Sequence, residues 1–195
     1  MSVKMLKAAM VGVILSVSSF ANAGLIINFN DISSNFRFQN LPSYDEAGYN
    51  ISVSCSNCSN VFTGDRGWGA SGSFLETWNN DAIYTLTNIS GANFNFTGFD
   101  MGWYNNDTSN AYWNIRAYDK DGLQIGTQDS YTGKGSVSVN YTNVSSIQFQ
   151  NNGPRQRGTY SSFDNLAVST IPEPTTLAIF ALGIMGLALR RVKKQ

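Results

Sequence analysis

The stretch YWNIRAYDKDGLQIGTQ, residues 112–128, contains the pattern that decides the fold. Trp113, Ile115 and Ala117 alternate with other residues, so in an extended strand they share one face. Residues 120–122, Lys-Asp-Gly, then separate this segment from a second candidate strand, LQIGTQ. Because an Asp-Gly pair suits the left-handed torsions of a tight turn, the stretch predicts an antiparallel hairpin.

Similar short runs recur through residues 24–170, a segment of the size of one domain. Asn, Ser, Thr, Gly and aromatic residues dominate it, and no helix-period segment appears outside the two ends of the chain. This composition and spacing predict an all-β domain, an antiparallel β-sandwich. The other candidate strands are LIINF, FRFQ, YNISVSC, AIYTLTN, NFNFTGFDMGWY, SVSVNYT, SSIQFQ and FDNLAV.

The first 23 residues have the three parts of a secretory signal peptide. Lys4 and Lys7 supply positive charge, residues 8–20 are mostly small and apolar, and residues 21–23 read Ala-Asn-Ala. The A-x-A sequence and the serines that interrupt the apolar run argue against an uncleaved membrane anchor. We therefore expect export, with cleavage after Ala23.

Residues 171–195 combine an extended motif, an apolar run and a basic end. Pro172-Glu173-Pro174 should be extended, because each proline fixes its own φ and restricts the residue before it. Leu177 to Leu189 carries no charge, and as a helix of roughly 20 Å it is a short transmembrane span for a hydrocarbon core of about 30 Å. The basic stop-transfer residues follow: Arg190, Arg191, Lys193 and Lys194.

These cations can reach the headgroups and should keep their end of the span cytoplasmic, which places residues 24–170 outside the inner membrane. A buried core helix is an alternative, but four cations without an acidic partner argue against it. A GPI signal is another, but its tail normally lacks a basic terminus. The Pro-Glu-Pro motif suits a protease substrate or a simple helix stop, and composition leaves both open.

In this order and spacing, the Pro-Glu-Pro, the apolar run and the basic end resemble the PEP-CTERM sorting signal of Gram-negative bacteria. The resemblance implies processing near Pro172-Glu173-Pro174 by an exosortase, a membrane-embedded protease/transpeptidase, and passage outward. It also implies an association with extracellular polysaccharide. The stretch from Phe94 to Val168, with Asp164-Asn165-Leu166 near its end, is similar to the galactose-binding-like jelly rolls that often precede such signals.

Charge and histidine content exclude several functions. Residues 24–170 hold seven Lys or Arg against twelve Asp or Glu, a net charge of −5. A body with this net negative charge is not expected to bind the phosphates of nucleic acid. The chain contains no histidine, which removes Ser-His-Asp and Cys-His catalysis and histidine zinc sites. Nothing in the sequence selects a pair of carboxylates for glycoside hydrolysis, so a secreted glycan hydrolase is a weak alternative.

Two local motifs can be interpreted either as structural elements or as chemical sites. Cys55 and Cys58 form a C-x-x-C without the surrounding pattern of a redox site, and in an exported chain they most simply make one disulfide. Residues 119–122, Asp-Lys-Asp-Gly, begin like a calcium loop, but Leu123 and Ser130 occupy later ligand positions. We predict a hairpin turn there, and no metal site or cofactor.

Aromatic residues and asparagines gather in the middle third of the chain. Aromatic rings can stack on the apolar faces of sugars while amides orient hydroxyl groups, although a sandwich core also needs aromatic residues. Parity with Ile115 places Trp113 in the core and leaves Tyr112 and Tyr118 outward. The candidate glycan contacts are Trp103, Tyr104 and Tyr112.

The sequence thus predicts three parts: a signal peptide (1–23), a β-sandwich body (24–170) and a sorting signal (171–195). We expect no catalytic activity. The expected role is structural or adhesive, in an extracellular polysaccharide or biofilm matrix, at the cell envelope or beyond it. The expected partners are an exosortase, the inner membrane during export of the protein, and an exopolysaccharide. The alternative is a dedicated carbohydrate-binding module.

Overall fold

The computed structural model describes residues 24–30, 43–55, 75–77, 82–103, 111–152 and 161–171, with only the backbone at 75–77 and at Trp103. Residues Gly24–Thr170 form one compact unit. All regular structure in the described ranges is β-strand, in antiparallel pairs, which confirms the predicted all-β class. Among these residues no helix is long and apolar enough to cross a membrane. The predicted signal peptide and the span from Leu177 to Leu189 lie outside them.

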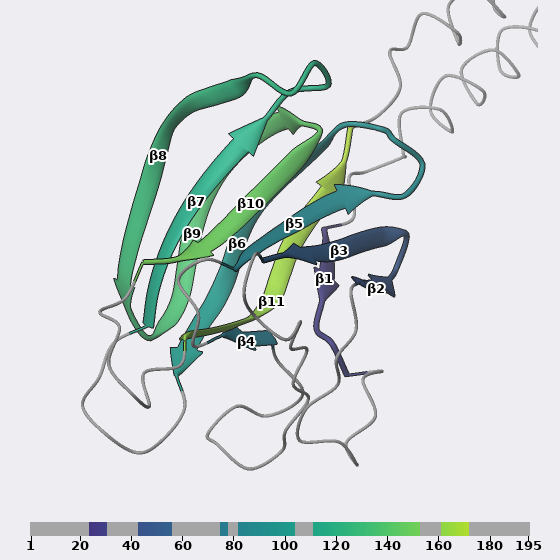
Figure 1. The fold of residues 1–195 in the computed structure, drawn as a ribbon. Coiled ribbons are helices and arrows are strands. Elements are labelled where there is room, and N and C mark those ends of the chain that lie inside the picture. The colour runs from purple at the N-terminus through teal and green to yellow at the C-terminus, as the bar shows by residue number, and fades with distance from the viewer. Residues whose placement is uncertain are drawn as a thin grey trace, which may run out of the picture. The chain divides into compact units, whose positions relative to one another are not determined.

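The described strands form two sheets (Figure 1). The six-stranded sheet, in front in the figure, has the order β2-β3-β5-β10-β7-β8. Its strands are β2 (Ser43–Glu46), β3 (Tyr49–Ser54), β5 (Ile83–Asn88), β10 (Ser146–Asn151), β7 (Ala111–Tyr118) and β8 (Gln124–Gly133).

The five-stranded sheet lies behind, in the order β1-β11-β6-β9. Its strands are β1 (Leu25–Ile27), β11 (Ser161–Thr170), β6 (Phe94–Trp103), β9 (Gly135–Val144) and β4 (Leu75–Thr77). Strand β1 pairs with β11 at residues 166–168 and β4 pairs with it at residues 161–163. The two short strands therefore cover successive parts of one edge of β11.

The predicted hairpin joins β7 to β8. Gly122 has a φ of 76° and donates its backbone N–H to the Asp119 carbonyl at 3.1 Å. The Asp119 carboxylate accepts from the backbone N–H groups of Asp121 and Leu123, at 2.9 Å each. The Asp119 side chain thus organises the turn itself, as an Asx-type turn does, which confirms the hairpin interpretation of this motif.

The core lies between the two sheets and is dominated by aromatic rings. Phe163 of β11 packs against Phe149 of β10, Trp113 of β7 and Tyr84 of β5, with ring centroids 4.7, 5.0 and 5.3 Å apart. All four side chains are at most 1% exposed. One residue of the rear sheet thus contacts three neighbouring strands of the front sheet. The prediction that Trp113 is a core residue is confirmed.

Buried hydrogen bonds also join the sheets, at the end where β7 begins. The Trp113 indole Nε1–H donates to the Ser162 carbonyl at 3.0 Å. The Ser161 hydroxyl accepts from the backbone N–H of Tyr112 and donates to the Asn151 side chain, both at 3.1 Å. Because these groups are buried, each bond satisfies a polar atom that would be costly to leave unpaired.

Strands β6 and β9 approach each other closely at Gly98. A Cβ atom at this position would lie 2.8 Å from the Val137 carbonyl oxygen, closer than real side chains come. The register between the two strands shifts on either side of Phe96, so the rear sheet bends here. A glycine at residue 98 allows this approach.

Gly98→Ala is therefore expected to lower the free energy of unfolding by about 1–3 kcal/mol, the usual cost of overpacking. Thr97→Ala, at an exposed neighbour on the same strand, should change it much less. Urea denaturation of the two variants and the parent protein measures the difference. An unchanged midpoint for Gly98→Ala would contradict the close approach of β6 and β9.

Candidate functional site

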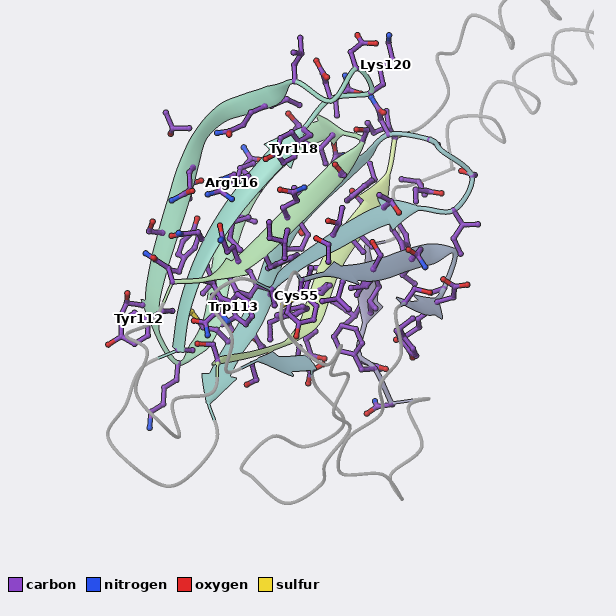
Figure 2. All side chains as sticks on the ribbon, viewed as in Figure 1. Cys55, Tyr112, Trp113, Arg116, Tyr118 and Lys120 are labelled. Carbon is purple, nitrogen blue, oxygen red and sulfur yellow. The ribbon has the colours of Figure 1, made fainter. Side chains whose placement is uncertain are left out.

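The outward face of the six-stranded sheet carries a row of polar and aromatic side chains on β7. Ala111, Trp113, Ile115 and Ala117 are fully buried in the core, and the residues between them point away from it. Figure 2 shows Tyr112, Arg116 and Tyr118 in succession along β7, with Lys120 in the turn beyond. This confirms that Tyr112 and Tyr118 face outward.

The strand register extends this polar row across the sheet. On β10, Gln148 lies between Thr85 of β5 and Arg116 of β7. On the same strand, Ser146 lies between Thr87 and Tyr118. These outward side chains are half-buried, and Asn114 between Trp113 and Ile115 is only 7% exposed, so each presents only part of its surface to solvent. We call this surface the β7–β10 face; its members are Tyr112, Asn114, Arg116, Tyr118, Ser146, Gln148 and Gln150.

Backbone hydrogen bonds fix both ends of the tyrosine row. The Tyr112 N–H donates to Ser161, and the Tyr112 carbonyl accepts from Asn152 N–H at 3.2 Å. The Tyr118 carbonyl accepts from the backbone N–H of Ser145 at 2.8 Å and from its hydroxyl at 3.1 Å. The backbones of Tyr112 and Tyr118 are therefore anchored roughly 20 Å apart, six residues at about 3.3 Å each.

Arg116 is the one cation on the β7–β10 face. Its Nη1 donates to the Gln150 side-chain oxygen at 3.0 Å. In the described part of the chain the only ion pair joins Lys120 to Asp121, in the exposed turn. The Arg116 guanidinium, half-buried on the sheet, thus has no carboxylate partner among the described residues.

The acidic side chains near β7 are directed elsewhere. Asp119 accepts the hydrogen bonds of the β7–β8 turn. Asp129 of β8 is opposite Ile115, on the core side of the sheet, and accepts a hydrogen bond from the Tyr141 hydroxyl of β9. Burial and this bond to Asp129 raise the pKa of Tyr141 far above its usual value. The Tyr141–Asp129 pair therefore links the edge strands of the two sheets, β8 and β9.

A second cluster of acids lies on the rear sheet, where Asp164 of β11 is directly opposite Asp100 of β6. Asp100 accepts from the Ser136 hydroxyl at 2.6 Å and from the Asn165 side-chain amide at 2.8 Å. Burial, with smaller contributions from Asp100 and Glu46, raises the pKa of Asp164 from 3.8 to about 6. In the described ranges, no group of three or more acidic or cysteine side chains is arranged to hold a metal ion.

The structure places the predicted contact residues as follows. Tyr112 lies on the β7–β10 face, and the backbone of Trp103 pairs with Ser161, whose hydroxyl bonds to Tyr112 N–H. Trp103 and Tyr112 thus come to the same end of the sandwich. The side chain of Trp103, and Tyr104 as a whole, lie outside the described residues.

The remaining predicted site residues fall largely outside the described ranges. Cys55 is disulfide-bonded and partly buried, and Cys58 lies outside them. Pro172, Glu173, Pro174 and the four terminal cations do too. The sequence reasoning did not select Arg116, Gln148 or Gln150. Strand alternation in YWNIRAYD and SSIQFQ was the signal that could have grouped them.

Comparisons with known proteins identify one sequence feature of the chain. Residues 170–193 match the PEP-CTERM protein-sorting motif, so the predicted sorting signal is confirmed. A motif of this kind indicates an exosortase-sorted, extracellular protein. A search of curated proteins finds no match to the sequence.

Among solved structures, the body is similar to the CBM22-1–CBM22-2 tandem domain of Paenibacillus barcinonensis Xyn10C, at 10% identity and a TM-score of 0.36. That match covers 80% of this chain and 49% of the tandem, so this chain spans about half of its length. It is also similar to CtCBM11 (14% identity, TM-score 0.34, 80% and 99% covered) and to the CBM22-1 xylan-binding domain of Xyn10C (9%, 0.33, 79% and 99%). Likenesses of this degree assign no ligand to this chain.

Asp164→Asn is expected to remove part of the pH dependence of stability. Because the folded state holds the Asp164 proton up to about pH 6 and the unfolded chain releases it near 3.8, this group lowers stability as pH rises through that window. The variant should therefore gain stability relative to the parent between pH 4 and pH 7. An asparagine can still accept the hydrogen bond from Asn165 N–H.

Thermal unfolding of the parent and variant proteins across this pH range measures the effect. Carboxylates distant from Asp164 contribute equally to both proteins, so the difference between them reports Asp164 together with its coupling to Asp100 and Glu46. A constant difference from pH 4 to pH 7 would contradict the raised pKa.

Proposed function

We propose that this protein is a non-catalytic matrix protein, which is exported, processed by an exosortase and held in extracellular polysaccharide by glycan contacts on its β7–β10 face. The body would be a jelly roll of the galactose-binding-like kind. The observation that carries the glycan contact is the outward row of Tyr112, Arg116 and Tyr118 on β7, with Gln148 opposite Arg116. The sorting motif at residues 170–193 supports the extracellular location.

The chemistry of the β7–β10 face suits a sugar chain. A pyranose ring presents apolar C–H patches and hydroxyl edges, so it needs aromatic surface for the first and hydrogen-bonding groups for the second. Tyr112 and Tyr118 supply the rings, and the amides of Gln148 and Gln150 lie on the next strand between them, opposite Arg116 and Asn114. The half-buried state of these side chains limits the conformational entropy that binding would remove.

The placement of the acids supports binding rather than hydrolysis. Glycoside hydrolysis requires two carboxyl groups on either side of the scissile bond. Of the acids next to β7, Asp119 is used in the turn and Asp129 faces the core side.

A dedicated carbohydrate-binding module would use the same face. Deletion of the gene distinguishes a matrix protein from such a module. A matrix protein alters the texture of the biofilm when it is lost.

The proposed route begins with cleavage after Ala23. The apolar run from Leu177 to Leu189 then stops in the inner membrane, with its cations in the cytoplasm. This leaves the extended Pro172-Glu173-Pro174 segment just outside the bilayer, within reach of a membrane-embedded exosortase.

Replacement of Pro172, Glu173 and Pro174 by alanine is expected to block this processing. In a host that has the matching exosortase, the parent protein should lose the tail that contains Arg190–Gln195, and the variant should retain it. Intact mass spectrometry of the medium and membrane fractions distinguishes the two products. Pro154→Ala, at a proline of the body, is the control. A parent product that still carries Arg190–Gln195 would contradict the proposed route.

Tyr112→Ala is expected to weaken binding to the exopolysaccharide of the host about tenfold, because one stacked ring contributes on the order of 1 kcal/mol and the lost area adds to it. Ser138→Ala, on the exposed side of β9 in the other sheet, is the matched control and should bind normally. Affinity electrophoresis in gels that contain the polysaccharide measures both. Full binding by Tyr112→Ala would remove the β7–β10 face as the site, and release of reducing sugar would contradict a non-catalytic role.

A further inference from the structure

Arg116 presents an unbalanced charge on an otherwise neutral surface. A guanidinium that is partly removed from water is stabilised by a carboxylate or phosphate partner, and its planar fork suits two parallel hydrogen bonds to one carboxylate. Here its one hydrogen bond among the described residues goes to the neutral amide of Gln150. The charge of Arg116 is therefore not neutralised within the part of the chain that the structure describes.

The other described charge on the outward side of this sheet is too far away to neutralise it. Asp45 lies on β2, four strands from β7, which is roughly 19 Å at the usual strand spacing. It already accepts a hydrogen bond from Asn50. At physiological salt the screening length is about 8 Å, so Asp45 has little effect on Arg116.

From this geometry we infer that the ligand of the β7–β10 face is an acidic polysaccharide, whose uronate carboxylates pair with Arg116. This inference rests on the proposed glycan-binding function and names its ligand class. The carboxylate would meet Arg116 while the adjacent amide of Gln148 bonds to hydroxyl groups of the same or the next sugar. Tyr112 and Tyr118, on either side of Arg116 along β7, would contact the ring faces of sugars further along the chain.

The net charge of the body limits the attraction between the protein and an acidic polysaccharide to short range. Residues 24–170 carry a net charge of −5, so the body repels a polyanion at long range. The attraction is then local, through one charge-assisted pair, and a polyanion without sugar faces gains little. A nucleic acid, which needs several phosphate contacts, is disfavoured by the same charge balance.

The test compares a uronate polymer with its neutral counterpart. The processed protein, recovered from the medium of a host that has the matching exosortase and therefore without the terminal cations, is measured by biolayer interferometry against immobilised alginate and against alginate whose carboxyl groups have been reduced to alcohols. We expect the parent to bind native alginate about three- to tenfold more tightly than the reduced polymer, as a partly buried ion pair contributes on the order of 1 kcal/mol.

The variants then assign the preference to one side chain. Arg116→Gln should lose the preference and bind native alginate no more tightly than the reduced polymer, and Arg116→Lys should recover part of the preference. Lys120→Gln is the matched control, because Lys120 is exposed, paired with Asp121 and outside the β7–β10 face. It should keep the full preference.

The outcomes of this test distinguish failure of the acidic ligand from failure of the glycan-binding function. Equal binding of native and reduced alginate by the parent, with loss of both in Tyr112→Ala, would overturn the acidic ligand and leave the glycan-binding face in place. A preference that persists in Arg116→Gln, at an unchanged unfolding midpoint, would also overturn it. Absence of binding to every polymer, including the exopolysaccharide of the host, would overturn both proposals.

Discussion

Phe163 carries the contact on which the rest of this structure depends. Its ring stacks on Phe149 at 4.7 Å and meets the edges of Trp113 and Tyr84, so one side chain of the rear sheet touches three adjacent strands of the front sheet. Each buried aromatic side chain contributes about 1.5–3 kcal/mol from area alone, and each ring pair adds about 0.5–1.5. This cluster therefore helps to determine how the two sheets align, together with the other contacts across the core, such as those of Phe96 and Phe99 with Phe149.

This alignment also determines which side chains the front sheet turns outward. In a strand, residues alternate between faces, so burial of Trp113 and Ile115 places Tyr112 and Arg116 on the other side. The indole bond to the Ser162 carbonyl fixes the rotation of Trp113, and the Ser161 hydroxyl holds Tyr112 N–H. The backbone of the outer row is thus positioned by contacts on the inner side of the sheet.

Strand alternation explains how much could be predicted from the sequence. It identified β7, β9 and β10 and the inward side of each, because these segments have a clear period of two. It missed β2, β4 and the second half of β8, QDSYTG, whose residues are polar and whose pairing depends on partners distant in the chain. For the site, aromatic residues were an obvious signal, but Arg116 and Gln148 come together only through the register of β7 and β10.

The edge strands of the two sheets carry features that disfavour pairing with another copy of the chain. A long exposed edge strand invites pairing with another copy, and inward-pointing charges and irregular register are known defences. Strand β8 has both: Asp129 faces the core side, and its register with β7 shifts after Ile115. The Tyr141 hydroxyl stabilises Asp129 from β9, the edge strand of the other sheet. These features disfavour strand addition at β8, and they leave the outward face of the front sheet, with the β7–β10 face, as the surface that the aromatic and amide side chains define.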